Sequence, residues 1–408
     1  MIQKITERIF SQIVEEKSYD VYFQPIIEVG KQKLLGCESL FRAFCGSERE
    51  QVSTEAVFRY ADRQSLTQKL DALSRQKALE NYAGHTADSL LFLNLESRLV
   101  PFYMEHRNQL LEELGHAGVP PEQIVLELNE KKEVADTTLR EFVEFFQSQG
   151  FLIAIDDMGE RNSNLNRLSI VQPDIVKIDR YMVSGIHQDT YKQIIVRSIA
   201  DMCRQLGVVV IAEGVECEEE IYTCVDIGIR FFQGYYFSKA VPLSQISRTA
   251  YWEKAKEIAW NYSDVLQQNI LHRYNVRKQS ITQELQHKLQ KVESQRRDIL
   301  LRNTIRSIGD IECVYLLDEH GRQITETLFN EQITFKNHYL YSPGCQGEYH
   351  SMQSYYYNAV IGEGAVTKSN SYISAATGHR CVTYSCLYQN KEGRQEILCI
   401  DFLLDMEN

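Results

Sequence analysis

Short apolar runs alternate with longer amphipathic stretches between about residue 20 and residue 240. The eight runs lie at residues 21–27, 34–41, 90–95, 123–128, 151–156, 174–179, 208–213 and 229–237. Continuous apolar runs separated by helical patterns are typical of mostly parallel strands that are buried on both faces. The pattern therefore predicts an α/β fold over residues 1–245, a (β/α)8 TIM-like barrel.

The next stretch, residues 246–308, has neither proline nor glycine and is predicted to be a long helical connector. Ile281, Leu285, Leu289 and Val292 follow one another at spacings of four, four and three, which gives one apolar stripe. Such a stripe fits a helix that packs on its own domain, and it also fits a connector that transmits a signal or forms a dimer. The sequence leaves both open.

The pattern changes to alternating strands and hairpin turns in residues 309–408. The tetrapeptides DEHG and NKEG each separate two alternating runs. A smaller antiparallel α+β domain of roughly 100 residues is the expectation for this region.

Composition narrows the classes of function. The chain has 408 residues, 43% hydrophobic residues and a formal charge of −12, which argues against a protein that coats nucleic acid polymers. No apolar run approaches the roughly 20 residues needed to span a bilayer, so no membrane insertion is expected. Ten cysteines without a CxxC pair, and no leader-like segment, indicate reduced thiols and a cytoplasmic location.

Polar residues stand near the ends of the apolar runs. In a parallel barrel the carboxyl ends of the strands form the catalytic mouth, so a polar side chain there can face a ligand. The residues in these places are Glu38, Asn94, Glu127, Asp156, Asp157, Lys177, Glu213 and Gln233. Taken singly, an acid at such a place is more often a helix cap or a solvated loop residue.

Four carboxylates from separate runs are predicted to converge at this mouth, those of Glu38, Glu127, Asp156 and Glu213. Their mutual repulsion would be costly unless cations neutralised it. Oxygen donors without His or Cys favour hard ions, so Mg²⁺ or Mn²⁺ is expected rather than zinc. Two adjacent aspartates allow two ions to share a ligand, an arrangement suited to in-line attack on a phosphodiester.

Lys177 has two interpretations. Its ammonium group can donate to an attacking hydroxide or to charge that develops on the phosphoryl group. Alternatively it forms a structural ion pair with Asp179, two residues along the same run.

Eight motifs in order make residues 20–245 similar to the EAL domain of cyclic di-GMP phosphodiesterases. They are YFQPI, ESLFR, LNLE, ELNE, DD, KID, AEGVE and QGYYFSKA. The resemblance implies hydrolysis of one phosphodiester bond of cyclic di-GMP to give linear pGpG. It also implies Mg²⁺ or Mn²⁺ as cofactor, with Ca²⁺ as another ion that occupies the site.

The resemblance assigns a role to each matching residue. The first metal ion would be bound by Glu38, Asn94, Glu127 and Asp156, and the second by Asp156 and Asp157. Catalysis would involve Lys177 at the nucleophilic water, with Glu213 and Gln233 ordering water or ligand nearby. Ligand binding would fall to Gln24, Arg42, Asp179 and Glu216, with Arg42 at a phosphate, to which a guanidinium is well suited, and Glu216 bracing the loop after the aspartates.

Two places depart from the family pattern. Ser39 replaces the alanine of the signature, a change expected to be mild. The family sequence DDFGTGYSSL is DDMGERNSNL here, so Arg161 replaces a glycine and Asn162 replaces the aromatic residue. Glycine adopts positive φ at little cost, whereas an arginine there would be strained or would force another loop path. The alternative is that Glu160 and Arg161 form a new bracing contact, for instance with Glu216.

Two functions follow from these observations. The first is a metal-dependent cyclic di-GMP phosphodiesterase regulated by its C-terminal domain, and the altered loop favours the second, a catalytically weak or inactive cyclic di-GMP receptor. Residues 309–408 resemble a PAS or Cache-like sensor domain, with an unknown small-molecule or protein signal. Tyr355, Tyr356, Tyr372 and Arg380 either line a pocket there or pack in a core or interface. A homodimer is expected from the connector and from the resemblance.

Overall fold

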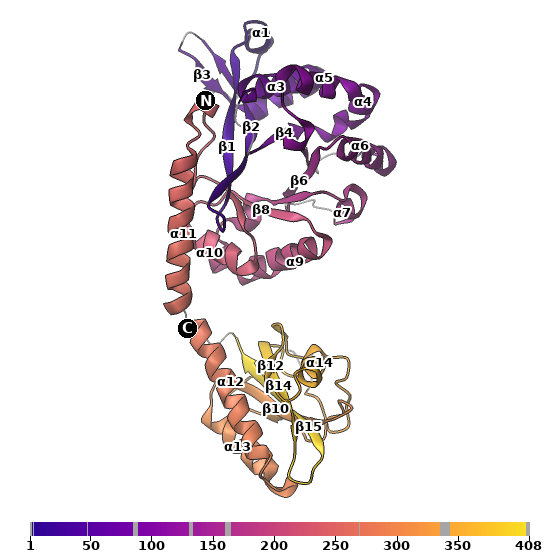
Figure 1. Cartoon of the computed structure of the whole chain (residues 1–408), viewed down its shortest axis with the longest axis vertical. Coiled ribbons are helices and arrows are strands. Elements are labelled where there is room, and N and C mark those ends of the chain that lie inside the picture. The colour runs from indigo at the N-terminus through magenta and orange to yellow at the C-terminus, as the bar shows by residue number, and fades with distance from the viewer. Residues whose placement is uncertain are drawn as a thin grey trace. The chain divides into compact units, whose positions relative to one another are not determined.

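The computed structural model of the chain describes residues 2, 4–46, 48–84, 89–129, 134–159, 165–268, 270–334 and 343–404. Its contacts divide the chain into two compact units, Met1–Asp264 and Val265–Asn408 (Figure 1). The boundary lies inside a helix of the stretch that the sequence predicts as a connector. No described helix is both long and apolar enough to cross a membrane.

The strands of the first unit close into a barrel. Its sheet has the order β1-β9-β8-β7-β6-β5-β4-β2-β3, and an additional pairing of β1 with β2 closes the ring. The strands are β1 (Tyr19–Glu28), β2 (Lys33–Cys45), β3 (Glu50–Val52), β4 (Leu90–Leu95), β5 (Ile124–Asn129), β6 (Leu152–Met158), β7 (Ile175–Ile178), β8 (Val209–Glu213) and β9 (Phe231–Gln233). The α/β barrel predicted from the apolar runs is confirmed, with each run forming one strand of the ring.

One strand departs from the parallel arrangement. β1 pairs antiparallel with both β2 and β9, while the pairs from β2 and β4 round to β8 and β9 are parallel. The short connection between Glu28 and Lys33 explains the reversal, because parallel neighbours need a longer crossover.

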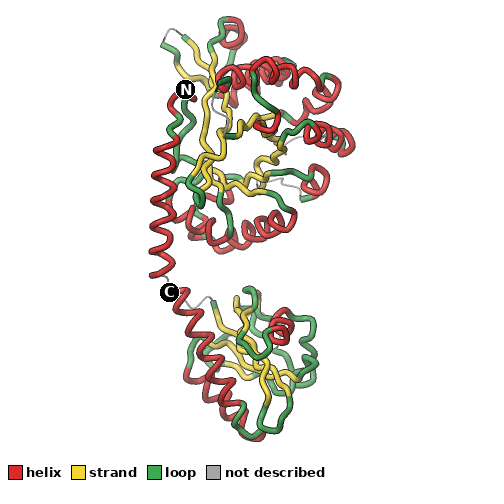
Figure 2. Tube along the Cα trace, in the orientation of Figure 1, coloured by secondary structure: helices red, strands yellow, loops and turns green. Residues whose placement is uncertain are grey.

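Helices lie outside the strands of this unit, as Figure 2 shows. They are α1 (Glu7–Glu15), α2 (Thr54–Arg63), α3 (Thr67–Tyr82), α4 (Val100–Glu105), α5 (Arg107–Ala117), α6 (Asp136–Ser148), α7 (Asn166–Val171), α8 (Arg180–Val183), α9 (Thr190–Leu206), α10 (Glu218–Ile227) and α11 (Arg248–Gln268). Tyr251, Ala255 and Ile258 of α11 are buried in the same apolar core as the barrel. The first part of the predicted connector therefore packs on the barrel.

Inside the barrel a layer of apolar side chains lies beneath the polar residues of the mouth. This layer is one buried cluster, Ile26, Phe92, Val125, Ala154, Ile175 and Ile211. Side chains two residues apart in a strand share a face. Each member of the layer is therefore followed, two positions toward the mouth, by a polar residue that points the same way, as Phe92 is by Asn94 and Val125 is by Glu127.

The second unit is an antiparallel sheet with helices on both faces. Its strands are β10 (Ile311–Asp318), β11 (Leu328–Phe329), β12 (Thr367–Lys368), β13 (Tyr372–Ile373), β14 (Arg380–Gln389) and β15 (Gln395–Leu403), and its helices are α12 (Ile270–Leu289), α13 (Arg297–Ser307) and α14 (Ser354–Ile361). Leu285 and Leu289 of the apolar stripe are buried with sheet residues such as Leu316 and Ile400. The stripe therefore packs on its own domain.

Candidate functional site

The predicted site residues come from neighbouring strands and meet at one end of the barrel. A pocket of about 300 Å³ opens there. Its lining includes eight of the predicted residues, Gln24, Glu38, Asp156, Asp157, Lys177, Glu213, Glu216 and Gln233. The side chains share one mouth because they occupy equivalent positions near the ends of adjacent strands.

Lys177 stands at the centre of the acidic side chains. Its Nζ lies 2.6 Å from Glu127 Oε1, 2.6 Å from Glu213 Oε1, 3.3 Å from Glu38 Oε2 and 3.4 Å from Asp156 Oδ1. The Lys177 side chain is 1% exposed. Among the described residues no ion pair joins Lys177 to Asp179. Lys177 instead contacts all four carboxylates that were predicted to converge at the mouth.

Glu38 is fixed by amide groups on both sides. Asn94 Nδ2 donates to Glu38 Oε1 at 2.8 Å, and Gln233 Nε2 donates to Glu38 Oε2 at 2.6 Å. Gln233 Nε2 also lies 3.3 Å from Gln24 Oε1. The Glu38 carboxylate of β2 thus joins β4 and β9 directly, and β1 through Gln233, which holds its orientation toward the pocket.

A bulge turns both aspartates toward the mouth. Neighbouring residues in a regular strand point to opposite faces. The register of β6 against β7 shifts between Ile155 and Met158, and Asp157 has φ of 58°, in the left-handed region. Asp156 and Asp157 therefore both line the pocket, and oxygens of Asp156, Asp157 and Glu213 lie within 4.8 Å of one another.

The protonation of the cluster reflects burial and crowding. Burial, together with the charges of Glu38 and Asp156, raises the pKa of Glu127 well above its usual value. Burial raises the pKa of Glu213 to about 8. Burial acts to lower the pKa of Lys177, but the four surrounding carboxylates outweigh it and raise this pKa well above its ordinary value. Lys177 is therefore charged at neutral pH.

Glu38 and Asp156 differ in the balance of the same effects. Burial raises the pKa of Glu38, yet the Lys177 charge and the hydrogen bonds from Asn94 and Gln233 bring it below its usual value. Burial raises the pKa of Asp156, and the partial offset from Lys177 does not reverse this. One lysine does not compensate four acids.

The donor set fits divalent cations. Glu127 Oε2 and Gln233 Oε1 are buried and have no hydrogen-bond partner among the described residues. Leaving such atoms unpaired is costly unless something else binds them. Carboxylate and amide oxygens without nitrogen or sulfur suit Mg²⁺, Mn²⁺ or Ca²⁺. The orphaned oxygens and the excess of acids both favour cations at this mouth.

Three predicted ligand-binding residues have partners outside the cluster around Lys177. Arg42 is half-buried at the side of β2, where its guanidinium lies 5.9 Å from the Tyr22 ring centre. Glu216 is exposed and pairs with Arg180 at 2.8 Å. Asp179 caps α8 by accepting from the Tyr181 backbone N–H at 2.8 Å, and it is absent from the pocket lining. Asp179 thus has a structural role visible in the fold.

Several residues of the mouth are not among those predicted from the sequence. Arg180, Tyr235 and Leu40 line the pocket. Asn129 Nδ2 donates to Asp157 Oδ2 at 2.9 Å. Strand alternation could have found Asn129 and Leu40, because they lie two positions beyond Glu127 and Glu38 on the same faces.

The two departures from the family pattern have different outcomes. Ser39 Oγ donates to the Phe92 carbonyl at 2.9 Å, so its buried hydroxyl is satisfied. Residues 160–164, which include Arg161 and Asn162, lie outside the described residues. Gly159 just before them has φ of 98°, and an added Cβ would lie 2.5 Å from Met182 Cγ. The chain thus requires glycine where the altered loop begins.

The tyrosines of the second unit are packed. Tyr355 is 6% exposed, and its ring lies 6.3 Å from that of Tyr372 in a stacked arrangement. Tyr356 donates from its hydroxyl to the Glu319 carbonyl at 2.9 Å. Arg380 reaches Ser371 Oγ at 3.4 Å. These contacts favour the packing interpretation over a shared pocket.

Comparison with known sequences gives the family. Residues 7–240 match the family described as EAL domain. One relative is YkuI of Bacillus subtilis (strain 168), which is described as an uncharacterized EAL-domain containing protein. The two sequences are 23% identical, and the match spans 89% of this chain and 90% of YkuI. PdeB of Escherichia coli (strain K12), described as a probable cyclic di-GMP phosphodiesterase, is 27% identical over 58% of this chain, which spans only 45% of PdeB.

Solved structures show the same fold. The crystal structure of Bacillus subtilis YkuI in complex with substrate c-di-GMP and calcium has a TM-score of 0.81 at 22% identity, and it covers 97% of this chain and 98% of its own. Klebsiella pneumoniae BlrP1, in a calcium and cyclic di-GMP complex, has a TM-score of 0.51 at 29% identity over 55% of this chain and 56% of its own. The order of a barrel, long helices and a smaller sheet unit along the chain is that of YkuI.

Proposed function

The chain belongs to the EAL domain family, and we propose that it binds cyclic di-GMP at the barrel mouth and hydrolyses one phosphodiester bond to give linear pGpG. The observation that carries this proposal is the cluster of four carboxylates around Lys177 at the pocket, where Glu127 Oε2 and Gln233 Oε1 have no hydrogen-bond partner in the part of the chain that the structure describes. Two relatives support cyclic di-GMP as the substrate. PdeB is described as a probable cyclic di-GMP phosphodiesterase, and BlrP1, which is 29% identical, forms a complex with calcium and cyclic di-GMP.

Divalent cations are part of the proposal. We assign one ion to Glu38, Asn94, Glu127 and Asp156, and a second to Asp156 and Asp157, with Glu213 close to both aspartates. When bound, such ions would polarise water and the phosphate oxygens and would neutralise charge in the transition state. Because the acidic side chains at the mouth are fixed by the barrel strands, they would hold the cations in a defined place, which a flexible surface cluster could not do.

Lys177 supplies a fixed positive charge rather than a base. Its raised pKa keeps the ammonium protonated, and its contacts with four carboxylates fix its position. A charged donor beside the reacting phosphate stabilises negative charge that develops there. Arg42 and Arg180, beside the acidic centre, are suited to hold the phosphate groups, because a guanidinium can donate two parallel hydrogen bonds.

The test is a turnover assay with the full chain. The protein is incubated with cyclic di-GMP and either Mg²⁺ or Mn²⁺, and the nucleotides are separated by chromatography. We expect linear pGpG, no product with a chelator, and loss of product in Glu38→Ala. Glu284→Ala, which removes an exposed acid of α12, is the matched control and keeps full turnover.

A catalytically weak receptor is the second candidate. The observation that favours it is the altered loop, where Arg161 and Asn162 replace residues that the family pattern has as glycine and an aromatic residue. Displacement of a supporting residue by about 1 Å can lower a rate roughly 100-fold. Saturable binding of cyclic di-GMP without linear product would support the receptor and defeat the hydrolase.

We further propose that the second unit, a PAS or Cache-like domain, controls the barrel, and that the chain forms a homodimer. Support comes from the long helices α11 and α12, which follow the barrel strands in the chain, and from the match to the YkuI structure over 97% of this chain. A mass by sedimentation that stays monomeric at all concentrations would contradict the dimer. A turnover rate unaffected by Leu285→Asp, which disrupts packing of α12, would contradict the control.

A further inference from the structure

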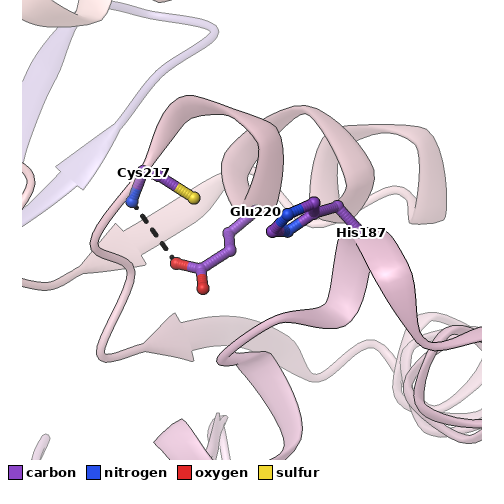
Figure 3. Close-up of side chains that lie close together, drawn as sticks. All are labelled: His187, Cys217 and Glu220. Carbon is purple, nitrogen blue, oxygen red and sulfur yellow. Dashed lines mark hydrogen bonds between the residues drawn. The ribbon is translucent and has the colours of Figure 1, made fainter.

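A second group of potential metal ligands lies in the barrel unit, apart from the oxygen-rich mouth. It consists of His187 in the 3-10 turn η3 (Ile186–Gln188), Cys217 just before α10, and Glu220 in the first turn of α10. One ligand atom of each lies within 4.8 Å of the other two. Figure 3 shows the three side chains together, with the Cys217 sulfur directed toward the imidazole of His187.

Capping contacts explain part of this arrangement. Glu220 Oε1 accepts from the Gly185 N–H at 2.8 Å, and Glu220 Oε2 accepts from the Glu216 N–H at 2.8 Å and the Cys217 N–H at 3.4 Å. These bonds fasten η3 to the start of α10 and orient the Glu220 carboxylate. They satisfy the backbone and use both lone pairs of Oε2, whereas Oε1 accepts one bond and keeps a further lone pair for another partner.

The capping contacts do not explain His187. Its Nδ1 is a buried atom with no hydrogen-bond partner among the residues that the structure describes. Leaving a buried nitrogen without a partner is costly. The other nitrogen, Nε2, lies 3.0 Å from the Gln188 side-chain amide. The atom placed there is the amide nitrogen; a flip of the exposed Gln188 amide turns its oxygen toward Nε2, so that Nε2–H donates and Nδ1 is left with a free lone pair for a metal ion.

The chemistry of the three donors differs from that of the mouth. An imidazole nitrogen, a thiolate and a carboxylate form a set typical of Zn²⁺, whereas the mouth offers only oxygens and a lysine. Tetrahedral zinc holds its ligand atoms roughly 3.5 Å apart, so small side-chain rotations would bring these three into range. His187 and Cys217 are half-buried, so both side chains are partly exposed to solvent, and a water molecule would be the fourth ligand.

We propose that His187, Cys217 and Glu220 form a zinc-binding site separate from the acidic site at the barrel mouth. Zinc would replace the thiol proton of Cys217 and bind Nδ1 of His187, which gives the orphaned nitrogen its partner. The site fastens the segment that joins Glu213 to α10. Glu216 in this segment pairs with Arg180 at the pocket, so zinc here would restrain one rim of the mouth.

The experiment uses the full chain, stripped with a chelator and then kept in excess Mg²⁺ so that the oxygen-rich mouth is occupied. Zn²⁺ is titrated against a chromophoric competitor, and Co²⁺ is added in parallel as a spectroscopic probe. We expect one tight zinc equivalent and a thiolate-to-cobalt charge-transfer band. Cys217→Ser and His187→Ala are each expected to lower zinc affinity by at least roughly 10-fold and to abolish or change the cobalt spectrum.

Two controls keep the result interpretable. Serine is a good N-cap, so Cys217→Ser retains the start of α10, and unchanged circular dichroism verifies this. Cys345→Ser removes the exposed cysteine of the other unit and is expected to leave the zinc titration unchanged. Zinc affinity that is the same in wild type, Cys217→Ser and His187→Ala, or a cobalt spectrum without a thiolate band, would overturn the proposal.

Discussion

The ammonium group of Lys177 lies 2.6 Å from Oε1 of Glu127, and both side chains are almost completely buried. Three further carboxylates contact the same ammonium group. Removing one partner from a buried ion pair is strongly destabilising, because the remaining charge has neither water nor a counter-charge. Lys177 and bound cations would both compensate the same acids, so the stability of the barrel and the binding of cations at its mouth depend on each other.

Lys177→Met tests this dependence. We expect the variant to lose about 3–5 kcal/mol of unfolding free energy in chelator, because four acids then face one another without compensation. Divalent cations should restore more stability to the variant than to the wild type. Urea unfolding with chelator and with Mn²⁺ measures both effects. Lys288→Met, at an exposed pair on α12, is the control and should change little.

Glu127→Gln separates charge from shape at the same place. Glu38, Asp156 and Glu213 still contact the Lys177 ammonium group in this variant, and burial raises the pKa of Glu127, so the amide should cost little stability when no cation is present. Its loss as an anionic ligand should weaken Mn²⁺ binding and lower turnover roughly 100-fold. Calorimetric titration with Mn²⁺ and the pGpG assay provide the two readouts. Wild-type affinity for Mn²⁺ in this variant would contradict the assignment of Glu127 to a cation.

The barrel and the acids at its mouth could be predicted from the chain, because buried strands leave continuous apolar runs and alternation places the polar residues that follow them. The direction of β1 could not be predicted from these runs, since an apolar run carries no sign of whether its neighbours are parallel. The apolar pattern also could not predict that Lys177 lies at the centre of four acids. It was equally compatible with an ion pair between Lys177 and Asp179. Those contacts depend on strands that are far apart in the sequence.

The bulge at Asp157 shows the same limit at one residue. Two adjacent acids suggest a shared metal site, but regular strand geometry would direct them to opposite faces. Only the pairing of β6 with β7, and the left-handed backbone at Asp157, turn both toward the pocket. The pairing depends on the neighbouring strand, so the letters DD alone do not encode it. Asp157 also accepts from Asn129, a partner recognisable only once the faces are known.

Substitutions at Asp157 test the role of this backbone. Asn adopts positive φ more readily than most residues, so Asp157→Asn should fold with near wild-type stability yet bind the second cation more weakly. Asp157→Ala should lose the same binding and about 1 kcal/mol of unfolding free energy in addition, from strain. Urea unfolding and Mn²⁺ titration distinguish the two. Equal stability of the Asn and Ala variants would contradict a strained bulge.

Gly234 tests the packing beneath Gln233. A Cβ at this position would overlap the backbone oxygen and nitrogen of Val215, which cannot move as a flexible side chain could. Gly234→Ala should therefore destabilise the barrel by about 2 kcal/mol or more and reduce turnover by displacing Gln233. Gly115→Ala in α5, where a Cβ meets nothing within 4 Å, is the control and should be neutral or stabilising. Comparable unfolding curves for the two variants would contradict the close approach.

Asp401 in the sheet of the second unit should make that unit less stable as the pH rises. Burial, and then the charge of Glu312, raises the pKa of Asp401 to about 7, compared with about 3.9 in an unfolded chain. Because the folded state binds the proton more tightly, stability is highest below the unfolded pKa and falls as the pH rises toward the folded pKa. The loss between about pH 5 and about pH 8 should be roughly 3 kcal/mol. Urea-dependent hydrogen exchange of β14 and β15, corrected for the intrinsic rate at each pH, measures this loss of stability.

Asp401→Asn should abolish the pH dependence of stability, because the amide does not titrate. Asp298→Asn, at an exposed position of α13, is the control and should retain it. The same pH slope in both variants would show that Asp401 does not carry the buried proton.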